Sequence, residues 1–215
     1  MKPGWHFWID RGGTLTDVVA RDPGGRLHVR KLLSEHPERY PDAPIYAIRE
    51  LLRITEGEDI PSARIASVKM GTTLATNALL ERKGARIGLL VTRGFADLLE
   101  IGYQDRPDIF ALQIIKPETL AARTIEIDER VLADGTIRRA VNADQLRAAL
   151  QELHDDEINS VAVVFLHSFA YPNHELAAGA IAREMGFGQI SLSHAVAGEI
   201  KAVGRGDTTT VDAYL

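Results

Sequence analysis

The segment of residues 10–17 constrains the fold more than any other part of this chain. It reads Asp-Arg-Gly-Gly-Thr-Leu-Thr-Asp and lies between two apolar, strand-like runs. Two adjacent glycines let the backbone turn sharply and approach a bulky anion, while a carboxylate at each end could hold a hydrated divalent cation. No lysine follows the glycines, so the segment is not the common G-x-x-x-x-G-K-[ST] phosphate loop. It predicts a nucleotide-phosphate site on a β-hairpin, with an ordinary exposed turn as the alternative.

Strand-like runs separated by glycine-rich turns predict a three-stranded meander around this segment. The strands cover residues 7–10, 16–21 and 27–32, with turns at Gly12-Gly13 and Pro23-Gly24-Gly25. Apolar periodicity then predicts helices at residues 43–55, 73–82 and 95–101, and strands at residues 65–70 and 87–91. The meander would carry the phosphate hairpin at its first turn.

Strands and helices alternate in the second half of the chain. Asp134-Gly135 predicts a hairpin between strands at residues 124–132 and 136–141. Asn142 is expected to cap a helix that reaches residue 154, and a strand at 161–166, a helix at 174–185 and a strand at 189–192 follow. The pattern predicts one three-layer α/β domain with a mixed sheet flanked by helices, and it leaves a small inserted α/β subdomain as an open alternative.

Three further segments carry a family resemblance. Residues 31–35 (Lys-Leu-Leu-Ser-Glu), residues 70–84, which begin Met-Gly-Thr-Thr-Leu-Ala-Thr-Asn, and residues 90–99 resemble the N-terminal domain of the hydantoinase/oxoprolinase family. Together with the glycine hairpin they place the chain in the actin-like ATPase superfamily by resemblance, from about residue 7 to residue 215. Arg11 and the Leu-Leu-Ser-Glu run favour the 5-oxoprolinase branch. The implied fold is half of an actin-like, ribonuclease H-like ATPase.

The resemblance also implies a domain plan and an activity. Residues 1–200 would form the family's N-terminal domain and residues 201–215 would begin the next ATPase segment, so the chain is expected to be truncated. The implied activity is ATP-dependent hydrolysis of 5-oxo-L-proline to L-glutamate through a phosphorylated amide. The alternatives are an ATP-dependent hydantoinase or a subunit of an acetone or acetophenone carboxylase. A kinase-like transferase or a non-catalytic nucleotide-binding module represents a different class.

The candidate site residues fall into three groups. Asp10 and Asp17 are the expected catalytic and metal-binding carboxylates, with turn capping as the alternative for Asp10. Expected nucleotide contacts come from Gly12, Gly13, Thr14 and Thr16. Expected substrate or phosphate contacts come from Thr72, Thr73, Asn77 and Arg93. Residues alone favour helix capping by Thr72 or Thr73, and a surface salt bridge is the alternative for Arg93; the resemblance favours the functional role.

Composition limits the classes of partner and the cellular compartment that are expected for this chain. A net charge of −5 and the lack of a basic stripe argue against a nucleic-acid partner. The chain has no cysteine, no signal-peptide pattern and no apolar run of membrane-spanning length, so a cytoplasmic location is expected. The resemblance implies ATP, Mg²⁺ and, as a further candidate, K⁺, with a small-molecule substrate. It also implies the rest of the same polypeptide, or a second hydantoinase-type subunit, as partner.

Two histidine-containing pairs could suggest a metal site. His167-Ser168 and His174-Glu175 lack H-E-x-x-H spacing, and Tyr171-Pro172 interrupts any helix between them. A structural turn is therefore the favoured interpretation. Trp5, Phe7 and Trp8 are expected to be core or edge packing residues.

Overall fold

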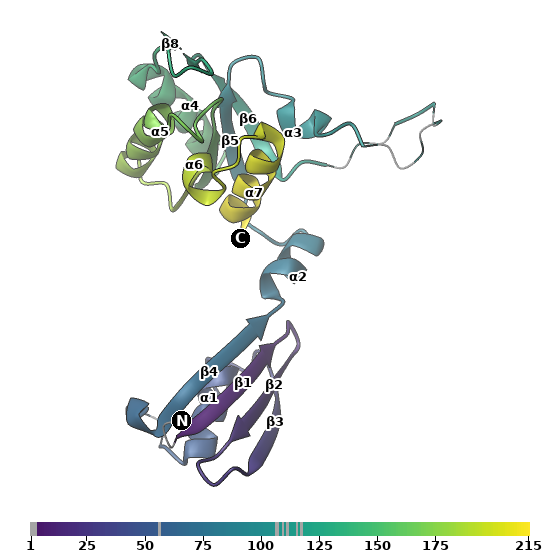
Figure 1. Cartoon of the computed structure of the whole chain (residues 1–215), viewed down its shortest axis with the longest axis vertical. Helices are drawn as coiled ribbons and strands as arrows, with labels where there is room; N and C mark the ends of the chain where they lie inside the picture. Colours follow the sequence, from purple (N-terminus) through teal and green to yellow (C-terminus); the bar gives the residue numbers. More distant parts are fainter. Residues whose placement is uncertain are drawn as a thin grey trace. The chain divides into compact units, whose positions relative to one another are not determined.

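A computed structural model describes residues 4–55, 57–105, 108, 110, 112–114, 116 and 118–215. The chain divides into two compact units, unit 1 over Met1–Arg82 and unit 2 over Lys83–Leu215 (Figure 1). Each unit has its own sheet and its own hydrophobic core. In the part of the chain that the structure describes, no helix is both long enough and apolar enough to cross a membrane.

Unit 1 contains the predicted meander within a mixed sheet. Its strands are β1 (Trp5–Arg11), β2 (Leu15–Arg21), β3 (Leu27–Leu33) and β4 (Ile65–Thr72), in the order β3-β2-β1-β4. The first three strands pair antiparallel, and β4 pairs parallel to β1. The expectation of a mixed sheet and of three adjacent antiparallel strands is confirmed.

A single helix, α1 (Ala43–Leu52), covers one face of this sheet. The Asp42 carboxylate accepts a hydrogen bond from the Ile45 amide and so starts the helix, while Arg53, in the left-handed conformation, ends it before the predicted residue 55. The core lies between helix and sheet and contains Phe7, Ile9, Val18, Ala20, Ala47, Ile48, Leu51 and Leu52. Because strand side chains alternate, the neighbours of these strand residues lie on the opposite face. A 3₁₀ turn, η1 (Ser62–Arg64), precedes β4, and helix α2 (Leu74–Leu80) follows it.

Unit 2 is a three-layer α/β unit with a parallel sheet. Its strands are β5 (Ile87–Thr92), β6 (Ala121–Ile127), β9 (Ser160–Val164) and β10 (Gln189–Leu192), in the order β10-β9-β5-β6. Helices α4 (Ala143–Asp155) and α5 (Asn173–Glu184) pack on the face that carries Val161 and Val163. Helix α7 (Ala202–Tyr214) packs on the face that carries Val164, where short helices α3 (Leu98–Ile101) and α6 (Ser193–Val196) also contact it (Figure 1).

Two expectations about the strands need correction. The α/β class with sheets flanked by helices is confirmed, but the strands form a mixed sheet in unit 1 and a separate parallel sheet in unit 2 instead of one mixed sheet. The predicted strand at residues 124–132 is interrupted at Asp128-Glu129, after which β7 (Arg130–Val131) pairs with β8 (Ile137–Arg139) in a hairpin of its own. The turn at Asp134-Gly135 is where the sequence predicted it. The domain boundary at residue 200 stays a prediction.

Candidate functional site

The hairpin between β1 and β2 aligns its two carboxylates. Asp10 pairs directly with Asp17 across the two strands, so both side chains project from the same face, with Cβ atoms about 5 Å apart. The Gly12 amide donates to the Leu15 carbonyl oxygen at 3.0 Å and closes the turn. Gly13 and Thr14 form an exposed tip. The predicted hairpin is therefore confirmed, and it presents two like charges beside a glycine turn.

The two carboxylates line a shallow groove on the sheet face opposite α1. The groove has a volume of about 400 Å³, and Trp8, Lys69 and Gly71 contribute to its lining. Trp8, which was expected to pack in the core or at an edge, is 38% exposed there. The groove therefore combines two carboxylates, one lysine and an indole ring at the end of the sheet where β1 and β4 lead into the hairpin tip and α2.

Asp17 has a charge partner and Asp10 has none among the described residues. The Lys31 ammonium group donates to both Asp17 carboxylate oxygens, at 2.8 and 2.9 Å. Lys31 lies directly opposite Asp17 on β3. Asp17 and Lys31 are equally distant in sequence from the turn predicted at Gly24. Antiparallel pairing across that turn therefore places them opposite each other. No single motif contains both residues, because the pair forms only when β2 and β3 align across the second turn.

Ser34 stabilises the hairpin tip through two hydrogen bonds to its backbone. Its amide donates to the Thr14 carbonyl oxygen at 2.9 Å, and its hydroxyl donates to the Gly12 carbonyl oxygen at 2.6 Å. The same hydroxyl lies 2.9 Å from the hydroxyl of Thr16. Sequence reasoning used Ser34 only as part of a family-like run, and its supporting role was missed.

Thr16 lies where it was not expected. Its side chain points toward the α1 side of the sheet and is 0% exposed, because it alternates with Asp17 along β2. Its hydroxyl is engaged with Ser34. The expected phosphate contact from the Thr16 hydroxyl does not fit this position, and the geometry gives Thr16 a supporting role in the hairpin.

The second candidate constellation adjoins the hairpin. The Thr72 hydroxyl donates to the Arg11 carbonyl oxygen at 3.0 Å and accepts from the Leu74 amide at 3.2 Å, so it ties β4 and the start of α2 to the hairpin. This corresponds to the capping alternative for Thr72. Thr73 precedes α2 without a side-chain capping bond, and its amide donates to the same carbonyl oxygen.

Asn77 of α2 lies against the glycine turn. A Cβ atom placed on Gly13 would be 3.3 Å from the Asn77 side-chain nitrogen, which is tighter than ordinary contact. Glycine at position 13 therefore admits the close approach of α2 to the tip. Residues some sixty positions apart in sequence meet at one end of the unit 1 sheet, and their use as ligand contacts stays a prediction.

The chemistry of the groove suits Mg²⁺ only together with other ligands. Magnesium prefers six oxygen ligands and commonly takes one or two carboxylates, phosphate oxygens and water. Asp10 and Asp17 supply two carboxylates, but the described residues contain no group of three or more metal-ligating side chains. Binding would also require Asp17 to share its oxygens with Lys31. The pair therefore fits a metal that arrives with phosphate groups, and not a closed protein cage.

Arg93 belongs to unit 2, after the end of β5. Its guanidinium group lies 3.6 Å from the Asp128 carboxylate and is 65% exposed, which corresponds to the surface salt-bridge alternative. Its approach to the unit 1 groove stays a prediction.

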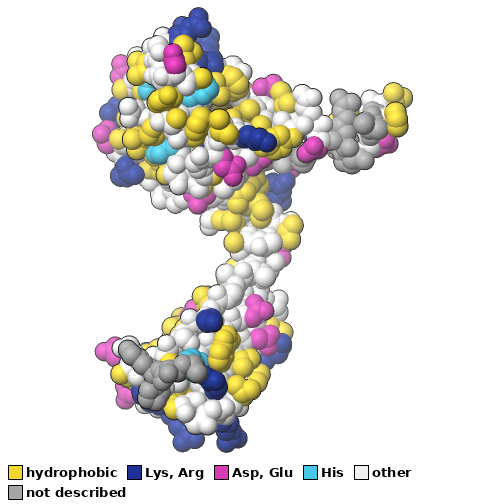
Figure 2. All heavy atoms as spheres, in the orientation of Figure 1, with side chains coloured by type: hydrophobic (Ala, Val, Ile, Leu, Met, Phe, Trp, Pro, Cys, Tyr) yellow, Lys and Arg dark blue, Asp and Glu magenta, His cyan; other side chains and the backbone are white. Residues whose placement is uncertain are grey.

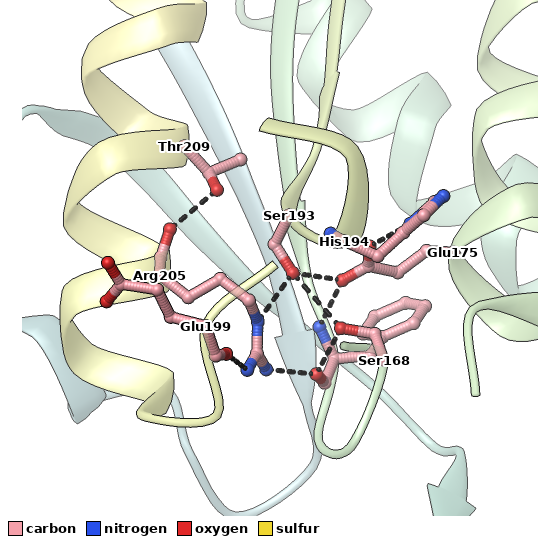
Figure 3. Close-up of polar contacts among 8 residues, drawn as sticks. Ser168, Glu175, Ser193, His194, Glu199, Arg205 and Thr209 are labelled. Atoms are coloured by element: carbon pink, nitrogen blue, oxygen red, sulfur yellow. Dashed lines mark hydrogen bonds and ion pairs between the residues drawn. The ribbon is translucent and has the colours of Figure 1, made fainter. Parts of the chain in front are cut away.

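Glu175 belongs to a buried polar network at the end of β9 (Figure 3), whereas its neighbour His174 pairs with Glu129 at 2.6 Å. The Glu175 carboxylate accepts from the Phe165 amide, the Ser193 hydroxyl and the ring and amide of His194, at 2.5 to 3.0 Å. Arg205 of α7 donates to Ser193 and to the Phe165 carbonyl oxygen. Burial lowers the pKa of Arg205, and the nearby Glu175 charge opposes that shift.

This network contains a serine, a histidine and a glutamate, but it is not a hydrolytic triad. In a triad the histidine must accept the serine proton. Here the Ser193 hydroxyl and the His194 ring both hydrogen-bond to Glu175, on different carboxylate oxygens. No serine-to-histidine bond forms within this network, so its geometry indicates a structural role that joins α5, α6 and α7.

Comparisons with known proteins agree with this architecture. The family model for the hydantoinase/oxoprolinase N-terminal region matches residues 6–186. 5-oxoprolinase 1 of Arabidopsis thaliana is 47% identical over 97% of this chain, and the 5-oxoprolinase of Dictyostelium discoideum is 43% identical over 100% of it. The crystal structure of the ATP-dependent caprolactamase from Pseudomonas jessenii matches 98% of this chain and 31% of that chain, with a TM-score of 0.77 and 27% identity.

The length of these relatives defines what the comparison covers. This chain spans 19% of each of the two 5-oxoprolinases. The residues that the family model matches include the hairpin, nearly all of unit 1 and most of unit 2. By its match over most of its length, the chain belongs to the hydantoinase/oxoprolinase family, whose N-terminal region it represents.

Proposed function

We propose that this chain is the N-terminal part of an ATP-dependent 5-oxoprolinase that hydrolyses 5-oxo-L-proline to L-glutamate. Full-chain similarity to named 5-oxoprolinases supports this proposal. The name of the caprolactamase neighbour, another ATP-dependent enzyme named for a lactam, supports the reaction class. The proposal extends to the cytoplasm as its location and to the remaining polypeptide, or a second subunit, as the partner that completes the site.

One observation carries the nucleotide part of the proposal. Asp10 and Asp17 are in register on one face of a hairpin whose tip is Gly12-Gly13-Thr14, and they line a common groove. Adjacent carboxylates at a glycine turn suit a metal that bridges to phosphate oxygens, and exposed amides and a hydroxyl suit the phosphate itself. Two like charges directly opposite each other are destabilising, and among the described residues Lys31 offsets the charge of Asp17 only.

The residues of the groove and the hairpin would have distinct roles. Asp17 would position Mg²⁺ or the attacking water, and Asp10 would share the metal. The tip residues would contact phosphate oxygens, with Thr73 and Asn77 as neighbours at the start of α2. Ser34 and Thr16 would hold the tip in shape.

The chemical need for ATP follows from the substrate. A lactam carbonyl is a poor electrophile because its nitrogen donates electron density into it. Transfer of the γ-phosphoryl group to the amide oxygen releases ADP and leaves a carbon that water can attack. Cleavage of the ring C–N bond then leaves a γ-acyl phosphate of glutamate, and a second water molecule hydrolyses it to glutamate and phosphate. Phosphoryl transfer depends mainly on positioning and charge neutralisation, which the groove residues are suited to supply.

The test is substrate-dependent ATP hydrolysis by the complete polypeptide that contains this chain. We expect 5-oxo-L-proline to stimulate phosphate release and to yield glutamate in equal amount, with no stimulation by hydantoin or acetone. Stimulation by hydantoin or acetone alone would move the protein to a different branch of the family. ATP hydrolysis without response to any of the three would contradict the proposed substrate.

A further inference from the structure

A second cavity lies in unit 2, separate from the carboxylate groove of unit 1. It has a volume of about 570 Å³ and opens beyond the C-terminal ends of β5 and β6, beside the β7–β8 hairpin. Small-molecule sites commonly have volumes of about 300–1,000 Å³. In open parallel sheets, ligands bind outside the carboxyl ends of the strands, near the strand where the connections reverse direction. Here the connections reverse direction between β5 and β9, and the cavity lies one strand pair away, beyond the ends of β5 and β6 at the same edge of the sheet.

The lining of this cavity is basic although the chain as a whole is acidic. Four arginines contribute to it, against two carboxylates, and the whole chain has a net charge of −5. The four are Arg93, Arg130, Arg138 and Arg139. Basic side chains, coloured dark blue, gather over β8 in Figure 2. The cavity therefore has a local excess of positive charge that its own residues do not neutralise.

The positions of these arginines leave guanidinium groups available for a ligand. Arg93 and Arg139 share a single oxygen of Asp128, and Arg93 reaches it only at 3.6 Å. Arg130 is fixed by a hydrogen bond to the Arg93 carbonyl oxygen and by stacking over the Phe95 ring. Within the described residues, Arg138 makes no ion pair or hydrogen bond and is exposed. Arg93 and Arg138 can therefore turn toward an anion without losing a buried partner.

The buried carboxylate of Glu129 contributes to the wall of the cavity. Glu129 is 1% exposed, and its carboxylate accepts from the Thr92 hydroxyl and pairs with the His174 ring at 2.6 Å. Each carboxylate oxygen of Glu129 already has a hydrogen-bond partner. Glu129 therefore forms part of the cavity wall and does not offer a free carboxylate to a ligand.

Backbone amides near the cavity are already occupied. Phosphate sites usually combine basic side chains with free backbone amides at a glycine turn. Gly94 forms such a turn, with a φ of 91°, but its amide and that of Ala96 donate to the Glu126 carboxylate at 2.8 and 3.2 Å. The remaining donors are guanidinium forks, which match carboxylate and phosphate groups alike, so the occupied amides at the glycine turn are what favour a carboxylate over a phosphate.

We propose that this cavity binds a small organic anion through its carboxylate group, held by Arg93 and Arg138. The inference uses neither ATP nor unit 1, so it does not depend on the proposed reaction. L-Glutamate and 5-oxo-L-proline serve as probes because both carry a carboxylate. Hydantoin has a comparable cyclic amide without a carboxylate, and inorganic phosphate tests the alternative anion.

The experiment is a titration of the 215-residue chain without nucleotide, followed by calorimetry and by amide NMR shifts at Gly94, Arg138 and Arg139. We expect saturable one-to-one binding of at least one carboxylate probe with a dissociation constant below about 10 mM. Hydantoin should cause no saturable shift, and phosphate should bind more weakly than the carboxylate. The Arg93→Ala/Arg138→Ala variant should weaken binding at least about tenfold.

Arg147→Ala provides the matched control. Arg147 is a similarly exposed arginine in α4 that pairs with Glu184 at 2.9 Å and does not line the cavity. Its replacement should leave binding unchanged. Arg138→Lys keeps the charge and removes the fork, so intermediate affinity is expected. Absence of saturable binding up to 10 mM, equal binding of the double variant and the native chain, or preference for phosphate over both carboxylates would each overturn the proposal.

The results also separate this inference from the proposed function. Carboxylate binding that depends on Arg93 and Arg138, together with an inactive complete polypeptide, would uphold the cavity and reject the reaction. If the complete polypeptide is an active 5-oxoprolinase but the N-terminal chain binds no carboxylate, the proposed reaction is upheld and the cavity proposal is rejected.

Discussion

Arg205 in α7 reaches Glu175 in α5 through the hydroxyl of Ser193. The Arg205 Nε atom donates to the Ser193 oxygen at 2.9 Å, and the Ser193 hydroxyl donates to the Glu175 carboxylate at 2.5 Å (Figure 3). All three side chains are 0% exposed. A buried charge is costly unless it is paired and hydrogen-bonded, so this bridge allows α7 to pack a guanidinium group against the sheet.

Replacement of Ser193 by alanine should therefore destabilise unit 2 strongly. The change leaves a guanidinium N–H and a carboxylate oxygen without their shared partner in a dry site. We expect the free energy of unfolding to fall by about 3 kcal/mol, as measured by urea denaturation. Thr208→Ala, at an exposed position in the same helix, should change it by about 0.5 kcal/mol or less. Equal effects from the two variants would show that the bridge contributes little.

The secondary structure of both units could be predicted, but their division could not. Strand alternation and glycine turns located β1, β2 and β3, and the apolar run at residues 87–91 located β5. Local patterns do not state which strands pair, however, so two sheets were expected to be one. The strand break at Asp128-Glu129 could not be predicted from the local sequence either. Glu129 is held there by Thr92 and His174, which are distant in sequence.

Ser34 and Thr16 should show strong coupling in a double-mutant cycle. Ser34→Ala leaves the Thr16 hydroxyl, which is 0% exposed, without its partner. We expect a loss of about 1–3 kcal/mol for Ser34→Ala. The Ser34→Ala/Thr16→Val double variant should lose less than the sum of the single variants, because both polar groups are then removed. Additive losses by urea denaturation would mean that the two hydroxyl groups do not act as a unit.

The carboxylate of Asp128 should titrate below its ordinary value of 3.8. The hydrogen bond from Arg139 is the main cause, burial opposes it, and the charges of Arg139 and Arg93 assist it, so the pKa of Asp128 is lowered. A lowered pKa in the folded state means that ionised Asp128 stabilises the fold above pH 3.8. This contribution is lost as the pH falls below 3.8 and through the lowered pKa.

NMR of the Asp128 side-chain carboxyl carbon measures this directly. The titration midpoint should lie below 3.8 in the native chain and should rise in Arg139→Gln. Arg147→Gln removes an exposed arginine elsewhere and should leave the midpoint unchanged. A midpoint that does not respond to Arg139→Gln would show that this arginine is not the main partner in solution.

The site was less predictable than the fold. Sequence motifs identified the glycine hairpin and Asp10 and Asp17, because glycine pairs and flanking acids are local signals. Which threonine hydroxyl is free could not be predicted, since Thr16 is turned inward by strand alternation and bonded to the distant Ser34. The arginine cavity was missed except for Arg93, because its lining comes from the end of β5 and from the β7–β8 hairpin.

Asp17→Asn in the complete polypeptide should abolish most substrate-dependent ATP hydrolysis while the fold is retained. The change keeps the shape of the side chain and removes the charge that would hold Mg²⁺ or orient water. We expect the turnover number to fall by at least about a hundredfold, the scale typical of losing one charge-stabilising group in an active site. Stability should change by no more than about 1 kcal/mol, because the Asp17–Lys31 pair is exposed.

Asp22→Asn is the matched control for this variant. Asp22 follows the opposite end of β2 and also pairs with a side chain on β3, since its carboxylate lies 3.0 Å from the His28 ring. Like Asp17, it pairs with a basic side chain of β3, but it lies at the opposite end of β2 from the hairpin tip. Asp22→Asn should therefore retain full turnover. If a folded Asp17→Asn enzyme is as active as Asp22→Asn, then Asp17 serves only its ion pair with Lys31, and the nucleotide-site proposal for the groove is wrong.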